Sequence, residues 1–230
     1  MSTQHWWTEI KALKSLLQKV TYETFCALVE NAPAGRNMRE IILHHTWSPT
    51  VAQYAGQETW RGIRDYHVNT RGWSDIGYHV GIAPDSSIWL LRPIQRTGGH
   101  CLGKNETSIG IVVLGNYDTG KDAVGAQWSM AKYVTAVLCE RFKLNEGNVY
   151  FHRDFADKSC PGTAINRAEF RTNVRALMDK DTKPEETGRV VKVIEHGTGR
   201  ILWPGTDERW ELVENGNHVD DQGKVYVRGA

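Results

Sequence analysis

The sequence predicts an α/β fold in which helices flank a central mixed β-sheet, with a helical N-terminal extension and a small C-terminal β module. Short apolar runs rich in β-branched residues, typical of buried strands, occur at residues 39–46 and 108–116. Helix-like segments alternate with them in a mixed order, which is typical of helices packed on one sheet. After residue 180 the pattern changes to short alternating runs separated by Gly, Asn and Asp, which predicts a separate β module.

The N-terminal segment, residues 5–31, predicts helices. Its apolar residues recur at helical spacing at Ile10, Leu13, Leu17 and Val20. The stretch YETFCALVEN follows as a second, shorter helix. We interpret residues 1–37 as an amphipathic extension packed on the main domain. A helix that binds a membrane surface or a partner is the alternative that the paired Trp6 and Trp7 raise.

Residues 38–180 are predicted to form the main domain. Strands are identified by β-branched apolar runs, and helices by apolar residues that return every three or four positions. Asn166, with Glu169 three residues on, resembles a reciprocal helix cap. The predicted elements are a buried strand at 39–46, a helix at 57–70 closed by Gly72, a hairpin of residues 77–84 and 86–93 that turns at Asp85-Ser86, a strand at 108–116, a helix at 125–143, a short strand at 148–152 and a helix from Asn166 to about Lys180.

The end of the chain predicts a linker and a small module. DTKPEETG is charged and contains Pro, and we interpret residues 181–187 as the linker. Residues 188–230 carry short alternating runs between turn residues, which predicts a β-rich module. Because so small a module has a thin core, we expect it to pack against the main domain or a partner.

Charge and composition exclude several classes of function. Lys plus Arg total 28 and Asp plus Glu total 27, a balance that does not favour a nucleic-acid partner. No window of about 18 apolar residues predicts a membrane span. The first residues lack the basic start, apolar run and cleavage site of a signal peptide, so we expect synthesis in the cytoplasm. In that compartment two disulfides among the four Cys are the less favoured interpretation.

Two His and one Cys form a candidate metal site. His152 and Cys160 lie eight residues apart in HRDFADKSCPG, where a loop can turn both side chains toward one point. His44 lies where a buried strand meets polar residues. Zinc accepts two imidazoles and one thiolate, and three protein ligands leave a fourth position for water or substrate. Because no fourth protein ligand is evident, this set favours a catalytic zinc over a structural one.

Four blocks in order resemble one known family. ILHHTWSPT, GWSDIGYHVGIAPD, GGH…NETSIGIVVLGN and HRDFADKSCPG are similar to successive blocks of the zinc-dependent N-acetylmuramoyl-L-alanine amidases. That family includes phage amidase-type lysozymes, bacterial amidases and peptidoglycan recognition proteins. The resemblance extends from about residue 39 to 180, and four ordered blocks are far more specific than one motif.

The resemblance implies roles for individual residues. The family's zinc ligands correspond to His44, His152 and Cys160, and its catalytic residues to Tyr78 and Lys158. Tyr78 is expected to hydrogen-bond the attacking water or the oxyanion. Lys158 is expected to stabilise the oxyanion or to protonate the leaving nitrogen. His45 alternates to the other side of the strand, so we interpret it as a structural residue or one that supports a ligand.

The resemblance also implies a reaction. It implies that a zinc-activated water hydrolyses the amide bond between N-acetylmuramic acid and L-alanine in bacterial peptidoglycan, in endolysin-type cell-wall lysis or in wall turnover. An enzyme without a signal peptide would reach the wall only after release from the cytoplasm, which for a phage-encoded protein is the host's. The C-terminal module is then a candidate for wall binding, with docking or dimerisation as alternatives.

Four further residues are predicted to contact substrate: Trp73, His79, His100 and Asn105. His100 lies in a Gly-rich turn whose backbone allows a ligand to approach closely. Solvent-facing or packing roles remain open for all four. Two other functions also remain open, namely a module that binds peptidoglycan without cleaving it and a zinc-stabilised interaction domain. The first would not need the metal ligands, and the second would require a fourth protein ligand.

Overall fold

A computed structural model describes residues 16–32 and 35–179, together with short backbone strands between 190 and 228. The chain divides into two compact units, Met1–Met178 and Asp179–Ala230. The helix predicted before residue 16 and the linker predicted at 181–187 lie outside the described residues.

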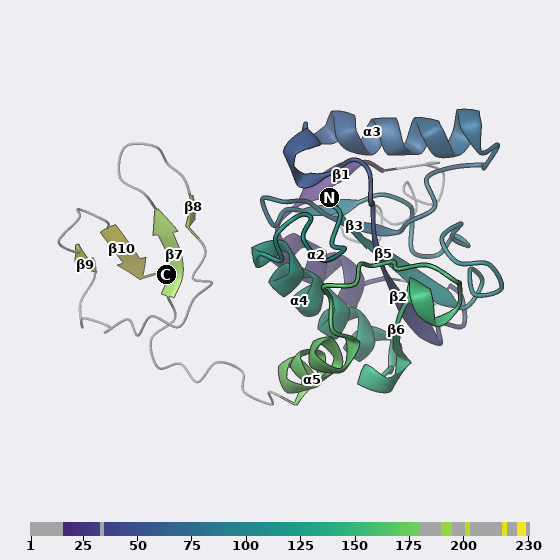
Figure 1. Cartoon of the computed structure of the whole chain (residues 1–230). Helices are drawn as coiled ribbons and strands as arrows, with labels where there is room; N and C mark the ends of the chain where they lie inside the picture. The colour runs from purple at the N-terminus through teal and green to yellow at the C-terminus, as the bar shows by residue number, and fades with distance from the viewer. Residues whose placement is uncertain are drawn as a thin grey trace. The chain divides into compact units, whose positions relative to one another are not determined.

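The first unit contains a six-stranded mixed sheet (Figure 1). The four strands β3, β5, β2 and β6 are parallel neighbours, whereas β4 is antiparallel to both β3 and β1. This arrangement confirms the predicted central mixed sheet. The strands lie in the order β1 (Gln18–Val20), β4 (Ile88–Leu90), β3 (Val80–Ile82), β5 (Ser108–Val113), β2 (Glu40–His45) and β6 (Val149–Phe151).

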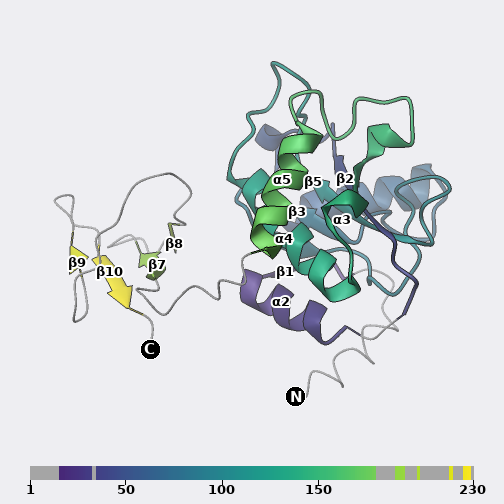
Figure 2. The ribbon, with the colours of Figure 1, turned by 90° about the horizontal axis from the view of Figure 1, so that it is seen from below.

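Helices cover both faces of this sheet (Figures 1 and 2). The larger apolar cluster joins one face of the sheet to helices α2, α4 and α5. The smaller cluster joins the opposite face to α3 through Trp60, which is fully buried. The helices are α2 (Tyr22–Glu30), α3 (Gln57–Asp65) with its π-helical continuation Tyr66–Thr70, α4 (Ala126–Phe142) and α5 (Arg167–Met178), with short 3-10 turns at Val51–Gln53, Glu146–Asn148 and His152–Asp154.

Alternation along β5 and β2 decides which residues face α3. Ile109, Ile111 and Val113 enter the larger cluster, whereas Val112 enters the smaller one. In β2, Leu43 enters the larger cluster. Since successive side chains point to opposite faces, the next residue, His44, faces the α3 side. The sheet therefore places His44 at the end of a fully buried central strand.

The helix predicted over residues 5–31 is wrong at 18–20, which form strand β1. This strand pairs with β4, with Gln18 opposite Leu90. The apolar spacing of Leu17 and Val20 fits a helix, but these residues instead extend the sheet by pairing with the edge of β4. The second helix is confirmed as α2, and the Thr21 hydroxyl caps it by accepting the Thr24 N–H at 3.1 Å.

The other predicted elements of the main domain are confirmed, with each boundary within three residues when the π-helical turn is counted with α3. The hairpin turns at Ser86, whose φ is 61°. Helix α4 ends at Lys143, which adopts the left-handed conformation. Helix α5 begins after Asn166, whose side chain accepts the N–H groups of Ala168 and Glu169 at 2.9 and 3.2 Å. Among the described residues, no helix has the length and apolarity that crossing a bilayer requires.

The second unit contains an antiparallel four-stranded sheet. Its order is β8 (Ile201–Leu202), β7 (Val190–Ile194), β10 (Val225–Arg228) and β9 (His218–Val219). The wall-binding or docking role that the sequence suggests for residues 188–230 stays a prediction.

Candidate metal centre and adjoining cleft

Three side chains distant in sequence meet at one point. One ligand atom from each of His44, His152 and Cys160 lies within 4.8 Å of the other two. The rings of His44 and His152 are 4.5 Å apart between centroids, and the Cys160 Sγ lies 3.7 Å from the His44 Nδ1. Two imidazoles and a thiol at this separation can close around one metal ion. Within the described residues this group contains three donors and no fourth.

The parallel pairing of β2 and β6 brings the two histidines together. Leu43 lies opposite Phe151 in the register of these strands. Because parallel strands end at the same sheet edge, the residue after each of these two reaches the same place. Those residues are His44 and His152. The register of these two strands thus brings together His44 and His152, which are far apart in the sequence.

Arg153 fixes the loop that carries Cys160. Its backbone N–H donates to the Cys160 carbonyl at 2.8 Å. Its guanidinium donates to the carbonyls of Gly162 and Ile165, each at 2.6 Å. These bonds fold the loop back on His152, so Cys160 is held beside the histidines before any ligand arrives.

Burial sets the protonation of the three donors. Burial lowers the pKa of His44 far below its ordinary value and also lowers that of His152. Burial raises the pKa of the Cys160 thiol to about 12. Both imidazoles are therefore neutral, which is the form that binds metals, and the thiol releases its proton when a cation takes its place.

His100 holds His44 from behind. The His44 Nδ1 faces Cys160, and its Nε2 lies 3.0 Å from the His100 Nδ1. This pattern assigns the proton to the His44 Nε2, which donates to His100. The other His100 nitrogen lies 3.3 Å from the Ser108 hydroxyl, which donates to the Lys104 carbonyl at 2.7 Å. The chain of contacts orients the His44 ring with its free Nδ1 toward the centre.

The seat of His100 requires glycine on two sides. A Cβ at Gly110 would lie 2.5 Å from the His100 ring, and a Cβ at Gly98 would lie 2.6 Å from it. The Asn105 Oδ1 accepts the backbone N–H groups of His100 and Cys101 at 2.8 and 2.9 Å. Asn105, predicted as a substrate contact, thus also holds the loop that carries His100.

The metal centre opens into a cavity of about 520 Å³, which we call the cationic cleft. Most of the predicted site residues line it. Three cationic side chains also line it, those of Arg71, Arg92 and Lys158. Among the described residues that line it, none carries a carboxylate. The predicted residues on its surface are Trp73, Tyr78, His100, Asn105, His152 and Lys158.

Tyr78 stands next to the donors as a neutral hydroxyl. Its ring centroid lies 5.2 Å from that of His44. Burial raises the pKa of Tyr78, so the hydroxyl keeps its proton and can donate a hydrogen bond. Lys158 is exposed at the cleft surface, where its ammonium group can approach a bound ligand.

His79, also predicted as a substrate contact, occupies a different environment. It is buried, and its Nδ1 accepts the Gly110 N–H at 2.9 Å. Its Nε2 donates to the Arg96 carbonyl at 3.0 Å. His79 is not among the residues that line the cationic cleft. Its contacts join β3 and β5 beneath the cleft floor.

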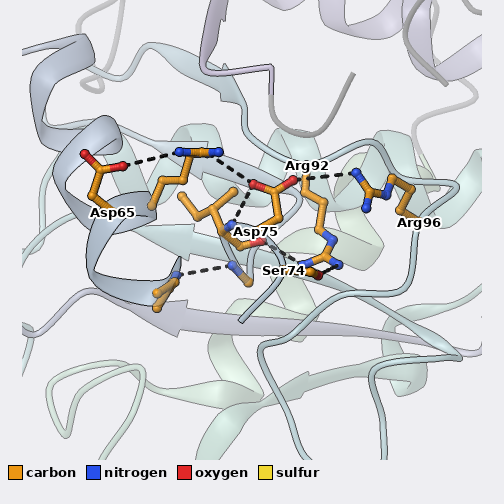
Figure 3. Close-up of polar contacts among 9 residues, drawn as sticks. Asp65, Ser74, Asp75, Arg92 and Arg96 are labelled. Atoms are coloured by element: carbon orange, nitrogen blue, oxygen red, sulfur yellow. Dashed lines mark hydrogen bonds and ion pairs between the residues drawn. The ribbon is translucent and has the colours of Figure 1, made fainter. Parts of the chain in front are cut away.

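The sequence analysis missed a buried ion cluster that supports the cleft wall. Asp75 is fully buried, and its carboxylate lies 3.5 Å from the Arg64 Nε and 3.8 Å from the Arg96 Nη1 (Figure 3). Arg92 donates to the Ile76 carbonyl at 3.0 Å. These contacts fix the segment between Trp73 and Tyr78. The motif GWSDIGY contains Asp75, but only its burial reveals this role.

Comparison with known proteins identifies the family that the chain belongs to. The model of the N-acetylmuramoyl-L-alanine amidase family matches residues 34–163, more than half of the chain. The chain is 34% identical over 126 residues to peptidoglycan-recognition protein SC2 of Drosophila simulans, covering 54% of this chain and 68% of that protein. It is 31% identical over 134 residues to the endolysin of Enterobacteria phage T3, covering 57% of this chain and 86% of the endolysin.

The fold is also shared with a solved amidase structure. The endolysin N-acetylmuramoyl-L-alanine amidase LysCS from Clostridium intestinale superimposes with a TM-score of 0.53 at 26% identity, covering 60% of this chain and 84% of that one.

Proposed function

Because this chain belongs to the N-acetylmuramoyl-L-alanine amidase family, we propose that it hydrolyses the bond between N-acetylmuramic acid and L-alanine in peptidoglycan. The observation that carries the proposal is the convergence of His44, His152 and Cys160 on one point beside a cleft. The family contains enzymes and recognition proteins. A chain that only recognised peptidoglycan would have no use for a complete donor set.

The donor set fits zinc. Two neutral imidazoles and one thiolate are ligands that zinc prefers, and three protein donors leave a position open. The contact between His100 and His44 is the kind of support that a ligating imidazole requires. Zinc bound by these residues supplies a Lewis acid and lowers the pKa of a coordinated water.

The chain's own residues perform the remaining work. The neutral Tyr78 hydroxyl, whose ring is next to that of His44, can donate a hydrogen bond to the oxygen that becomes negative when the amide carbon is attacked. Lys158 brings a positive charge to the same cleft and can donate a proton to the leaving nitrogen of L-alanine. Arg71 and Arg92 attract the carboxylates of the stem peptide.

The test is a product analysis combined with a metal measurement. Wild-type protein incubated with purified peptidoglycan should release new L-alanine amino termini without new reducing sugar ends, and should contain one zinc per chain. Cys160→Ala should lose both zinc and release. If Cys160→Ala releases amino termini at the wild-type rate, the metal assignment is wrong. If the wild type contains zinc but binds peptidoglycan without cleaving it, the protein is a recognition module.

The biological setting that we propose is cell-wall lysis or wall turnover. The similarity to a phage endolysin supports the first. Both settings use the same reaction, so the test above applies to both.

A further inference from the structure

Two separate groups of contacts hold the loop that carries Cys160. The first comes from Arg153, which binds backbone carbonyls of the loop. The second comes from the segment Tyr117, Asp118 and Thr119, which follows β5 and has been given no role so far. A thiol forms only weak hydrogen bonds, so Cys160 cannot fix its own position. The position of its sulfur depends on what holds the backbone before and after it.

The Asp118 carboxylate joins the two ends of the turn that presents Cys160. Its Oδ2 accepts the Ser159 hydroxyl at 3.2 Å, and its Oδ1 accepts the Thr163 N–H at 3.1 Å. Ser159 immediately precedes Cys160, and Thr163 follows it within the same turn. A single side chain thus closes the turn around the ligand. We call this pair of hydrogen bonds the Asp118 latch.

The neighbours of Asp118 bring the same two segments together. The Tyr117 carbonyl accepts the Ala164 N–H at 3.0 Å, and the Thr119 N–H donates to the Thr163 hydroxyl at 2.8 Å. Gly162 has a φ of 117°, and a Cβ at this position would overlap the Tyr117 carbonyl. The two backbones therefore lie so close together that the loop cannot shift without breaking these contacts.

The latch is tied to the strand that carries His44. Tyr117, the residue before Asp118, is fully buried and donates its N–H to the His45 Nδ1 at 3.2 Å. His45 ends β2 and directly follows His44. A ligand on a rigid strand and a ligand on a loop thus share one support. Residues behind the ligands of a metal site commonly provide such support.

We propose that Asp118 is a positioning residue for the metal centre, which holds the Cys160 sulfur close enough to His44 and His152 for all three to bind one ion. The proposal rests on the proposed function for the presence of a metal. It adds a role for a residue that is not among those lining the cationic cleft. Because the role depends on hydrogen bonds, a neutral side chain of the same shape that keeps them should be able to replace the carboxylate.

Cobalt(II) in place of zinc reports on the bond to sulfur without any catalysis. A thiolate bound to cobalt gives a charge-transfer band in the near ultraviolet, so cobalt(II) is titrated into the full-length metal-free protein. Asp118→Ala should weaken cobalt binding about tenfold, the lower end of the effect of losing such a support, and should reduce the band per bound cobalt. Asp118→Asn should restore most of both, because its amide can accept the Thr163 N–H and donate to the Ser159 hydroxyl.

Asp85→Ala is the matched control. The Asp85 carboxylate also accepts one backbone N–H and one hydroxyl, both from Ser87, but it does so in the turn between β3 and β4. This variant should bind cobalt as the wild type does. Circular dichroism of each variant confirms that it is folded.

Alkylation of Cys160 gives a second readout, which needs no metal. Cys160 is only 8% exposed, so iodoacetamide reaches it when the loop opens. In the metal-free protein, Asp118→Ala should raise its rate of alkylation, located by mass spectrometry, about tenfold, because the open loop is then more populated. Cys139, fully buried in α4, is the internal reference and should react at its wild-type rate.

The outcomes separate this proposal from the proposed function. Wild-type cobalt binding and a wild-type band in folded Asp118→Ala refute the positioning role. Equal losses in the Ala and Asn variants also refute it, because the charge of Asp118 would then matter and not its hydrogen bonds. Faster alkylation of Cys139 together with Cys160 shows a general loss of stability and refutes it as well. A wild type that binds no cobalt refutes the metal centre of the proposed function, whereas faster alkylation of Cys160 alone in Asp118→Ala would still show that the latch fixes this loop.

Discussion

Replacing His100 tests whether a residue behind a ligand controls metal binding. His100→Ala removes the acceptor of the His44 Nε2 proton, which lies 3.0 Å away. The variant leaves all three donors, His44, His152 and Cys160, in the chain. Any loss of metal affinity then reports on the orientation of His44 and not on the loss of a ligand.

The structure sets the expected magnitude. His44 is only 1% exposed, so its N–H has no ready access to water when its partner is removed. An unsatisfied buried donor costs about 1–3 kcal/mol. Loss of the partner of a ligating histidine lowers metal affinity about 10- to 100-fold, which corresponds to about 1.4–2.8 kcal/mol. The two ranges agree, and we expect zinc affinity to fall by about 30-fold, within that range.

The assay is competition for zinc against a chromogenic chelator, combined with a thermal melt of the metal-free protein. His100→Gln is the matched control, because its side-chain carbonyl can still accept from the His44 Nε2 and should restore most of the affinity. A folded His100→Ala protein that binds zinc within twofold of the wild type would refute the assignment. Equal losses in the Ala and Gln variants would show that the shape of the seat between Gly98 and Gly110 matters more than the hydrogen bond.

Three further predictions follow from the site and its support. Lys158→Ala should retain zinc but lower kcat about 100-fold, measured by the release of amino termini. Lys158→Arg should keep part of the rate if only the positive charge matters. Unchanged turnover by Lys158→Ala with metal bound would remove Lys158 from the reaction. Asp75→Asn should lower the free energy of unfolding by about 1–3 kcal/mol in urea titrations, because the partly exposed Arg64 and Arg96 lose their counter-charge. A loss below about 1 kcal/mol would contradict this role. Burial, and to a smaller extent the charge of Arg71, lowers the pKa of His67 to about 4. In the unfolded chain the same imidazole has a pKa of about 6.5. The free energy of unfolding of the metal-free protein should therefore fall as pH falls from about 6.5 to 4. His67→Asn should reduce that pH dependence, and an unchanged slope would contradict the assignment.

The sequence was sufficient for the strands, most helices and the three donors because each depends on local pattern or on an ordered motif. The run at residues 39–46 has three consecutive apolar residues, two of them β-branched, which predicts a buried strand, and the structure buries all of β2. The donors could be assigned together because HRDFADKSCPG and ILHHTWSPT are both distinctive. The N-terminal strand could not be predicted, because Leu17 and Val20 fit helical spacing and the pairing with β4 depends on residues some 70 positions away.

The interactions between side chains could not be predicted from the sequence either, because they also depend on residues that are far apart in the chain. His79 and His100 lie in comparable motifs, and both were predicted to contact substrate. Their different roles depend on their neighbours. His79 uses both ring nitrogens in hydrogen bonds to the Gly110 N–H and the Arg96 carbonyl. His100 instead contacts His44 and lines the cationic cleft. Hydrogen-bond partners at such sequence distances follow from strand register, which no local pattern encodes.

The choice between enzyme and recognition module depends on what each function would require of the buried polar groups. Binding peptidoglycan without cleaving it needs a cleft and its walls, and it would be equally well served by apolar residues in place of His44 and Cys160. Burying these polar side chains without a metal costs free energy, because their contact with each other is 3.7 Å long and a thiol is only a weak hydrogen-bonding group. His100, Ser108 and the glycines at 98 and 110 add further constraints that help to orient His44. A site with these costs is explained when the three donors hold a cation, which would lie beside the cationic cleft, where a bound substrate can be cut.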